Sequence, residues 1–356
     1  MRNAIAQMKK SLPPRGAVLI SAPVSRRCLT GFESSDGLLF ITPDAAVFLT
    51  DSRYIEAARV EITACPVEEL KDAGAQLRAL CKEHRAKRLF VETGRATLGE
   101  AARLGKYLPG VWVETRDSRV DKALREIRLC KTPEEVDCVR RAQGIAETAF
   151  AHMLGVLKPG MAEREIALEL DYATLRGGAQ ALSFETIAVA GENGSKPHGV
   201  PGNKKIQAGD LLTLDFGAVV NGWHSDMTRT VAIGEPGGEQ RKIYGIVLEA
   251  QLAALEKLAP GVACKEIDAA ARDVIKNAGY GEHFRHGTGH GVGLEIHEAP
   301  TLSRKSKDVL EPGMVVTVEP GIYLPGHCGV RIEDMILITE TGYENLTKAG
   351  KDLIVL

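Results

Sequence analysis

Two aspartates flank a tight turn near the middle of the chain, and their spacing limits how this region can fold. The segment LLTLDFGAVVNGWHSDMTRTVAI places β-branched and apolar residues on both sides of Asn221 and Gly222. Such a pattern is the strongest short-range signal for a two-residue hairpin. Counting outward from the turn puts Asp226 opposite Gly217, which shares a sheet face with Asp215. The two carboxylates therefore become diagonal neighbours, about 5–8 Å apart.

Carboxylates at this separation repel each other unless a positive charge lies between them, and a divalent cation would supply that charge. In the strand-like segment GVRIEDMILI, Arg331 and Glu333 share one face of a half-buried strand, whereas Asp334 points the other way. An unpaired carboxylate in such a strand is costly, and metal coordination removes the cost. The segments HGTGHGVGLEIHEAP and VVTVEPGIYL, the second of which reads as a buried strand, add further candidates: His286, His290, His297 and Glu319.

An internal repeat supports this choice of ligands. LKPGMAEREI, which begins at Leu157, matches LAPGVACKEI, which begins at Leu258, at an offset of 101 residues. GDLLTLDFG matches GMVVTVEPG at an offset of 104, which aligns Asp215 with Glu319, and a further slip to 107 aligns Asp226 with Glu333. The period is too long for a solenoid. We therefore expect two similar α+β halves that face each other across a pseudo-two-fold axis, with one site on the axis.

These residues resemble the metallopeptidase family of methionine aminopeptidase, aminopeptidase P and prolidase, which has the pita-bread fold. The resemblance is strong from about residue 131 to the end. PHGVPGNKKI, SDMTRTV, HGTGHGVGLEIHE and EPGIY are similar to the Xaa-Pro branch, and GFESSDGLLF with FLTDSRYIEAA resembles its extra N-terminal domain. The family's set of two Asp, one His and two Glu ligands is matched in order by Asp215, Asp226, His290, Glu319 and Glu333.

Two domains are expected from length and pattern. Residues 1–125 alternate short apolar runs with helical patterns and predict a smaller α/β domain of the creatinase type. Residues 126–356 predict the α+β pita-bread catalytic domain. Thr132 followed by Pro133 and two glutamates predicts the start of a helix. The inward face of that helix is predicted to carry Val136, Val139, Ala142, Ile145 and Ala149.

Composition excludes several classes of function. A formal net charge of −2 gives no basic surface for nucleic acid. No apolar run approaches the about 18 residues that a membrane span needs, and the N-terminal residues lack the apolar core of a secretory signal. Seven cysteines without metal-binding spacing indicate reduced, mostly buried thiols and a cytoplasmic protein. The resemblance also implies a homodimer.

Four carboxylates and one imidazole suit two divalent ions better than an ordinary open zinc site. Manganese or cobalt fits this ligand set best, with zinc as an alternative. Two ions about 3.5–4 Å apart would lower the pKa of bound water toward 7 and make it a nucleophile. The resemblance implies that this water attacks the carbonyl before a proline nitrogen. The resemblance implies that Asp226 and Glu333 bridge the ions. It also implies that Asp215 binds one ion and that His290 and Glu319 bind the other.

The resemblance assigns roles to the residues around the ions. Glu319 would carry a proton, His198 and His297 would steady the substrate and the oxyanion, and Arg331 would hold the carboxylates. His286 and Tyr323, with Arg331, would form the wall that receives the proline ring. Simpler interpretations remain open, because a loop histidine often caps backbone and a strand-edge arginine is often only solvated. In the N-terminal domain, Asp51 and Arg53 would either form a structural ion pair or reach the site of a neighbouring subunit.

Three functions are compatible with the sequence. The first is an aminopeptidase that releases the residue before proline from short Xaa-Pro peptides. The second is a prolidase, which is restricted to Xaa-Pro dipeptides and would ignore an Xaa-Pro-Yaa tripeptide. The third is a metal-free relative, such as a creatinase-like hydrolase or a non-catalytic binding protein. Because all five acidic and imidazole positions are present, the sequence disfavours the third, and we place the aminopeptidase first.

Overall fold

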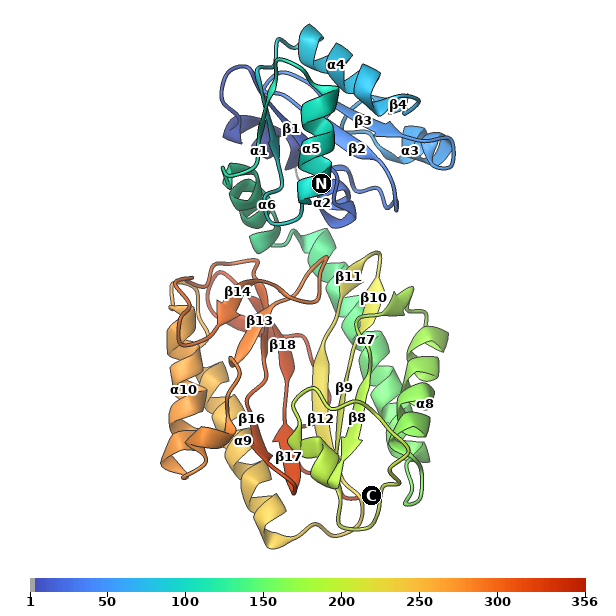
Figure 1. The fold of residues 1–356 in the computed structure, drawn as a ribbon. Coiled ribbons are helices and arrows are strands. Elements are labelled where there is room, and N and C mark those ends of the chain that lie inside the picture. The colour runs from blue at the N-terminus through green and yellow to red at the C-terminus, as the bar shows by residue number, and fades with distance from the viewer. Residues whose placement is uncertain (1–3) are drawn as a thin grey trace. The chain divides into compact units, whose positions relative to one another are not determined.

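The computed structural model describes residues 4–356 and divides them into two compact units, with the boundary between Arg128 and Leu129. Figure 1 shows the helices and strands of both units. Across the described residues, every helix is too short or too polar to cross a membrane.

The first unit is a six-stranded mixed sheet with helices on both faces, as the alternating pattern predicted. Its strand order is β4-β3-β2-β1-β5-β6. Side chains alternate along β1, so Val18 and Ile20 enter one apolar cluster while Ala17 and Leu19 enter the other. The strands are β1 (Gly16–Ile20), β2 (Leu38–Ile41), β3 (Ala46–Thr50), β4 (Val67–Glu69), β5 (Arg88–Val91) and β6 (Trp112–Glu114). The helices are α1 (Ala4–Ser11), α2 (Pro23–Thr30), α3 (Ile55–Glu61), α4 (Ala73–Glu83), α5 (Leu98–Tyr107) and α6 (Arg119–Leu129).

The second unit has two pairs of helices around short antiparallel sheets. Its helices are α7 (Pro133–Val156), α8 (Glu163–Arg176), α9 (Gly238–Glu256) and α10 (Cys264–Asn277), with 3₁₀ turns η1 (Gly191–Ser195) and η2 (Gly281–His283). The strands of its first half are β7 (Ala181–Leu182), β8 (Ile187–Ala190), β9 (Leu211–Phe216), β10 (Ala218–Val220), β11 (Trp223–His224) and β12 (Met227–Ala232). Those of its second half are β13 (Gly289–Gly291), β14 (Glu298–Leu302), β15 (Val315–Val318), β16 (Gly321–Leu324), β17 (Cys328–Arg331), β18 (Asp334–Ile338) and β19 (Tyr343–Asn345).

The two halves of the second unit repeat each other, as the sequence offsets predicted. Helices α8 and α10 have the same length, 14 residues, and start 101 residues apart. The turn before each helix is closed by the same type of backbone bond, from Gly160 N to Ile206 O at 2.9 Å and from Gly261 N to Leu310 O at 2.8 Å. In Figure 1, α7 and α8 flank the strands of the first half, and α9 and α10 flank those of the second.

The central hairpin has the predicted register. Val220 pairs with Trp223, and in the same register Asp215 pairs with Thr228. Both turn residues have positive φ, 47° at Asn221 and 68° at Gly222, as a tight two-residue turn of this type requires. Between the two paired stretches, a Cβ at Gly217 would lie only 1.9 Å from Ser225 O, so glycine is required where the two arms come closest.

Two segments that the sequence predicted as single strands are each broken in the structure. GVRIEDMILI forms β17 and β18, and Glu333 lies between them. VVTVEPGIYL forms β15 and β16, and Glu319 lies between them. The prediction of one half-buried strand was wrong because the chain changes partners there: Arg331 pairs with Gly321, whereas Asp334 pairs with Val318. Glu319 and Glu333 therefore each lie between two strands and not within a paired strand.

The helix start predicted at Thr132 is confirmed. The side chain of Glu135 accepts from Thr132 N at 2.8 Å, and Glu135 N donates to Thr132 Oγ1 at 3.4 Å, which together form a capping box. The inward face is buried as predicted except at Ile145, which is half-buried. The thiols are less buried than expected: of seven, only Cys81, Cys264 and Cys328 are buried.

Candidate metal centre

Five side chains from both halves of the second unit converge on one cavity. Asp215 lies on β9 and Asp226 directly precedes β12, while Glu319 and Glu333 occupy the two strand breaks and His290 lies in β13. The cavity has a volume of about 750 Å³. Its lining contains all five of these side chains and also His198, His286, His297 and Arg331. Nine of the ten residues to which the sequence assigned a role in metal or substrate binding, all except Tyr323, therefore line this cavity.

The imidazole of His290 faces the carboxylates through its Nε2 atom. Nε2 lies 3.5 Å from Glu319 Oε1 and 3.6 Å from Asp226 Oδ2. Nδ1 lies 3.0 Å from the backbone oxygen of Gly291, a contact that fixes the proton on Nδ1 and leaves Nε2 with a lone pair for a metal ion. Ligand atoms of Asp226, His290 and Glu333 all lie within 4.8 Å of one another, which is close enough to share an ion.

Three carboxylate oxygens in this cluster are buried without any hydrogen-bond donor among the described residues. They are Asp215 Oδ1, Asp226 Oδ1 and Glu333 Oε1. Buried oxygens of this kind are normally paired, because an unpaired one keeps its full desolvation penalty. A divalent cation is an oxygen-seeking partner for all three, and the donor set of four carboxylates and one imidazole therefore fits such ions.

Burial dominates the electrostatics of the cluster. It raises the pKa of Asp226 and of Glu333 well above the ordinary range, and the neighbouring carboxylates raise both values further. Burial also raises the pKa of Glu319 to about 8 and lowers the pKa of His290 to about 4. In the protein alone Asp226, Glu319 and Glu333 thus resist ionisation, and a bound cation would reverse that preference.

Arg331 connects Asp215 to Thr228 and Tyr323 through hydrogen bonds. Its Nη2 donates to Asp215 Oδ2, its Nη1 donates to Tyr323 Oη at 2.8 Å, and its Nε donates to Thr228 Oγ1 at 3.0 Å. Thr228 Oγ1 in turn donates to Glu333 Oε2 at 2.6 Å. Thr228 was not identified from the sequence, although the hairpin register, which pairs it with Asp215, could have indicated a place beside the site.

Three histidines complete the lining. The ring centroids of His290 and His297 lie 4.4 Å apart in an edge-to-face arrangement. His198 lies in the loop after η1. Burial and the charge of Arg331 lower the pKa of His286 to about 4, so this imidazole is neutral at physiological pH. Its Nε2 lies 3.0 Å from the hydroxyl of Tyr323, which also accepts from Arg331 Nη1, so Tyr323 contacts two of the residues that line the cavity.

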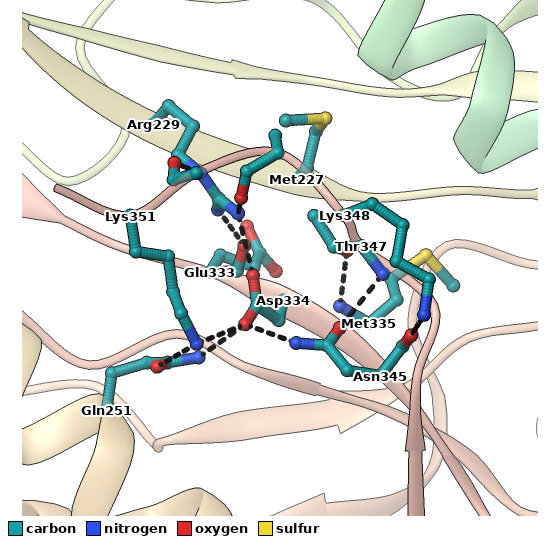
Figure 2. A network of polar contacts seen from close by, with 12 residues as sticks. Met227, Arg229, Gln251, Glu333, Asp334, Met335, Asn345, Thr347, Lys348 and Lys351 are labelled. Carbon is teal, nitrogen blue, oxygen red and sulfur yellow. Dashed lines mark hydrogen bonds and ion pairs between the residues drawn. The ribbon is translucent and has the colours of Figure 1, made fainter. Parts of the chain in front are cut away.

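Asp334 has a separate environment, although it follows Glu333 directly (Figure 2). Its oxygens accept from Arg229 Nη2 at 2.8 Å, Lys351 Nζ at 2.8 Å, Gln251 Nε2 at 2.9 Å and Asn345 Nδ2 at 2.8 Å. Burial raises the pKa of Asp334, but the charges of Arg229 and Lys351 outweigh burial and hold that pKa below its ordinary value. Asp334 thus points away from the cavity, as strand parity predicted.

The first unit contains the pair that the sequence left open. Arg53 Nη2 lies 2.6 Å from Asp51 Oδ2 and 3.1 Å from Asp36 Oδ2. Both contacts are at the surface, because the Arg53 side chain is 61% exposed. A structural ion pair is therefore present within the chain.

Known proteins match both units. The model of metallopeptidase family M24 matches residues 137–340, and that of the creatinase/prolidase N-terminal domain matches residues 14–130. The uncharacterized peptidase YqhT of Bacillus subtilis is 42% identical over 340 residues, 95% of each chain. A Xaa-Pro dipeptidase of Pyrococcus horikoshii is 38% identical over 326 residues, 89% of this chain and 88% of its own.

Solved structures agree with the sequence matches. The Xaa-Pro dipeptidase from Bacillus anthracis superposes with a TM-score of 0.95 at 38% identity and covers 99% of both chains. The X-Pro aminopeptidase from Thermotoga maritima superposes with a TM-score of 0.90 at 33% identity and covers 98% of this chain and 100% of its own. The pita-bread fold and the creatinase-type first domain predicted from the sequence are confirmed. The chain belongs to metallopeptidase family M24 and is a peptidase of its Xaa-Pro branch.

Proposed function

We propose that the protein is a dinuclear metal-dependent Xaa-Pro dipeptidase, a prolidase, that cleaves the bond between the first residue and proline. This reverses the order of the two peptidase functions in the sequence analysis, which placed the aminopeptidase first. The proposal rests on one observation: five side chains that can bind metal line the same cavity, and three of their buried carboxylate oxygens have no hydrogen-bond donor among the described residues. Relatives named Xaa-Pro dipeptidase, similar over most of their length, favour the dipeptidase.

Asp215, Asp226, His290, Glu319 and Glu333 would hold two divalent ions, with manganese or cobalt as our first choice and zinc as the alternative. When bound, such ions polarise the scissile carbonyl and lower the pKa of water. Glu319 borders both the cavity and His290, so its carboxylate is placed to take a proton from the attacking water and deliver it to the proline nitrogen. The proline nitrogen leaves as an amine only after it gains a proton, and this delivered proton supplies it.

The remaining side chains would orient the peptide. We assign His198 and His297 to the substrate and its developing oxyanion, where each donor contributes about 2.7–4 kcal/mol. His286, held in its neutral form beside Tyr323, is suited to face an apolar proline ring. Arg331 would keep the Asp215 carboxylate aimed at the cavity through the hydrogen bond between them. A metal-free hydrolase of the same fold would leave the three orphaned oxygens without a partner.

The second candidate, a Xaa-Pro aminopeptidase, is favoured by the similarity to the Thermotoga maritima enzyme. The two functions differ only in whether the site accepts residues beyond proline. A matched set of Leu-Pro, Leu-Pro-Gly and Leu-Ala tests both with one Mn²⁺-loaded preparation. We expect hydrolysis of Leu-Pro alone. Efficient release of leucine from Leu-Pro-Gly would establish the aminopeptidase, and equal hydrolysis of Leu-Ala would contradict any Xaa-Pro function.

The proton role of Glu319 needs its own test, because the same residue is a proposed ligand. Glu319→Gln keeps the shape of the side chain and removes the basic oxygen pair. We expect kcat for Leu-Pro to fall at least about 10²-fold, the lower end of what general acid–base catalysis contributes. A variant that binds metal yet keeps most of its turnover would rule out the assignment.

We also propose a homodimer, which light scattering would report as twice the 38.3 kDa of the chain.

A further inference from the structure

We propose that Asp334 and Lys351 are positioning residues for Glu333, and that the segment 345–351 thereby sets the affinity of the metal centre. The inference rests on the proposed role of Glu333 as a metal ligand. Glu333 and Asp334 are consecutive, with 2% and 0% of their surfaces exposed. Glu333 lines the cavity, whereas Asp334 lies in a polar network on the opposite side of the chain (Figure 2).

The backbone of Glu333 is held at both of its polar groups. Its N–H donates to Thr228 O at 3.2 Å, and its carbonyl oxygen accepts from Arg229 Nη1. Glu333 lies in the break between β17 and β18, so no strand ladder holds it. The position of its backbone therefore depends on these two contacts and on what fixes its neighbour Asp334, while Thr228 Oγ1 holds one oxygen of its carboxylate.

The guanidinium of Arg229 uses all five of its N–H donors, the full inventory of this group. Nη1 donates to the carbonyl oxygens of Thr228, at 2.9 Å, and of Glu333. Nε donates to Gly350 O at 3.0 Å, and Nη2 donates to Ala349 O at 2.7 Å and to Asp334. The side chain is 2% exposed. Arg229 therefore links the segment 345–351 directly to the backbone of Glu333.

Asp334 is held from four separate elements. Its donors lie on β12, α9, β19 and the segment that follows β19, and they are Arg229, Gln251, Asn345 and Lys351. Lys351 Nζ also donates to Gln251 Oε1 at 3.0 Å, so the ammonium joins two members of the network. A side chain fixed by four bonds fixes the orientation of its own backbone, and hence the direction in which the preceding side chain leaves the chain.

This arrangement matters because metal centres tolerate little displacement. Ligand atoms have to be held within about 0.5 Å of their working geometry. Residues behind the ligands typically contribute about 10–100-fold in metal affinity. Lys351 is the most separable member of the network, since its side chain is 19% exposed and Asp334 keeps its bond to Arg229 without it.

Lys351→Met removes the ammonium and keeps the apolar stem of the side chain. Lys351→Arg is the conservative rescue. Lys348→Met is the control from the same segment, because the Lys348 ammonium makes no bond to Asp334 among the contacts described and reaches only the backbone oxygen of Asn345. Metal-stripped proteins are titrated with Mn²⁺, and the EPR signal of free Mn²⁺ gives the dissociation constant. Thermal unfolding of each metal-free variant is measured in parallel.

We expect Lys351→Met to raise the Mn²⁺ dissociation constant about 10–100-fold, while Lys351→Arg and Lys348→Met stay within about twofold of the wild type. Wild-type affinity in Lys351→Met would overturn the inference, whether or not its unfolding temperature falls. If Lys351→Met is unfolded at the assay temperature, Gln251→Met removes another of the four bonds, and its affinity decides in the same way. Absence of Mn²⁺ binding by the wild type would instead overturn the proposed metal centre.

Discussion

Two buried acidic environments lie on opposite sides of the chain at residues 333–334 in the second unit. One surrounds Asp334 and the other contains the cluster around Glu333, and they differ in how the carboxylate oxygens are hydrogen-bonded. Asp334 accepts four hydrogen bonds, two of them from cations, and its pKa is held below the ordinary value. The carboxylates around Glu333 retain three oxygens without a donor, and burial raises the pKa of Asp226 and Glu333. Burial alone therefore does not identify a functional acid. A buried carboxylate oxygen without a hydrogen-bond donor in the protein does, because a bound cation can then be its partner.

The largest expected effect separates the two consecutive residues in metal-free protein. Asp334→Asn should lower the free energy of unfolding by about 3–5 kcal/mol, because Arg229 and Lys351 lose a buried counter-charge. Glu333→Gln should leave it nearly unchanged, because burial and the neighbouring carboxylates raise the pKa of Glu333 so far that the metal-free protein already holds this side chain neutral, as glutamine is. Urea denaturation with EDTA measures both. In a Trp112→Phe background, Trp223 is the remaining tryptophan and reports on the second unit.

Equal destabilisation by the two substitutions would erase the distinction between the clusters. A loss of stability in Glu333→Gln alone would invert it, and would mean that the ionised carboxylate is already paired within the protein.

Each bound metal ion should produce the next largest effect. Mn²⁺ at about 100 times its dissociation constant should raise the free energy of unfolding by about 2.7 kcal/mol for each site, because ions bind only the folded arrangement. EDTA should reverse the gain, and Asp226→Asn should abolish most of it. Calorimetric unfolding curves recorded with and without Mn²⁺ give the comparison. No shift in the wild type would mean that the donor-free oxygens are not an ion site.

The pH dependence of metal-free protein should be smaller and should have a defined sign. Burial raises the folded pKa of Glu319 to about 8, so the folded state holds a proton that the unfolded state has released. The contribution of Glu319 to stability therefore falls as pH rises from about 4.5 to 8, by at most about 1.4 kcal/mol per pH unit, and above about 6.5 the titration of neither His286 nor His290 overlaps it. His290 and His286, whose folded pKa values are about 4, change stability only below about 6.5. With saturating Mn²⁺ the fall should vanish, since the metal keeps the carboxylates ionised; a fall of the same size would contradict this.

The smallest effect is expected at the exposed pair of the first unit, which serves as a reference for both buried clusters. Arg53→Gln removes a surface pair with Asp51, and such pairs are worth little in water. We expect no measurable change in the unfolding temperature or in kcat/KM for Leu-Pro. An unchanged unfolding temperature with a reduced kcat/KM would support the alternative in which these residues reach the site of a neighbouring subunit.

The sequence predicted the placement of the candidate ligands well where one local rule governed the geometry. The Asn221-Gly222 turn fixed the hairpin register, so the placement of Asp215 opposite Thr228 follows from counting alone. The repeat predicted that Glu319 and Glu333 would occupy equivalent places in the second half. Strand parity correctly separated Glu333 from Asp334 even though the assumed single strand is broken between Arg331 and Asp334.

The sequence failed where distant partners decide the outcome. Nothing in GVRIEDMILI signals that β17 and β18 join different sheets, because the change depends on which strands lie beside them. The Asp334 network draws Arg229, Gln251 and Lys351 from three separate parts of the chain, so no spacing rule reveals it.

Crystals grown with Mn²⁺ and measured at the manganese absorption edge would test the account most directly. We expect two anomalous peaks in the cavity, about 3.5–4 Å apart, each within bonding distance of the carboxylates of Asp226 and Glu333. No peak should lie beside Asp334. Peaks elsewhere, or a cavity in which the four carboxylates remain without bound ions at saturating Mn²⁺, would contradict the claim that the unpartnered acids form a metal centre.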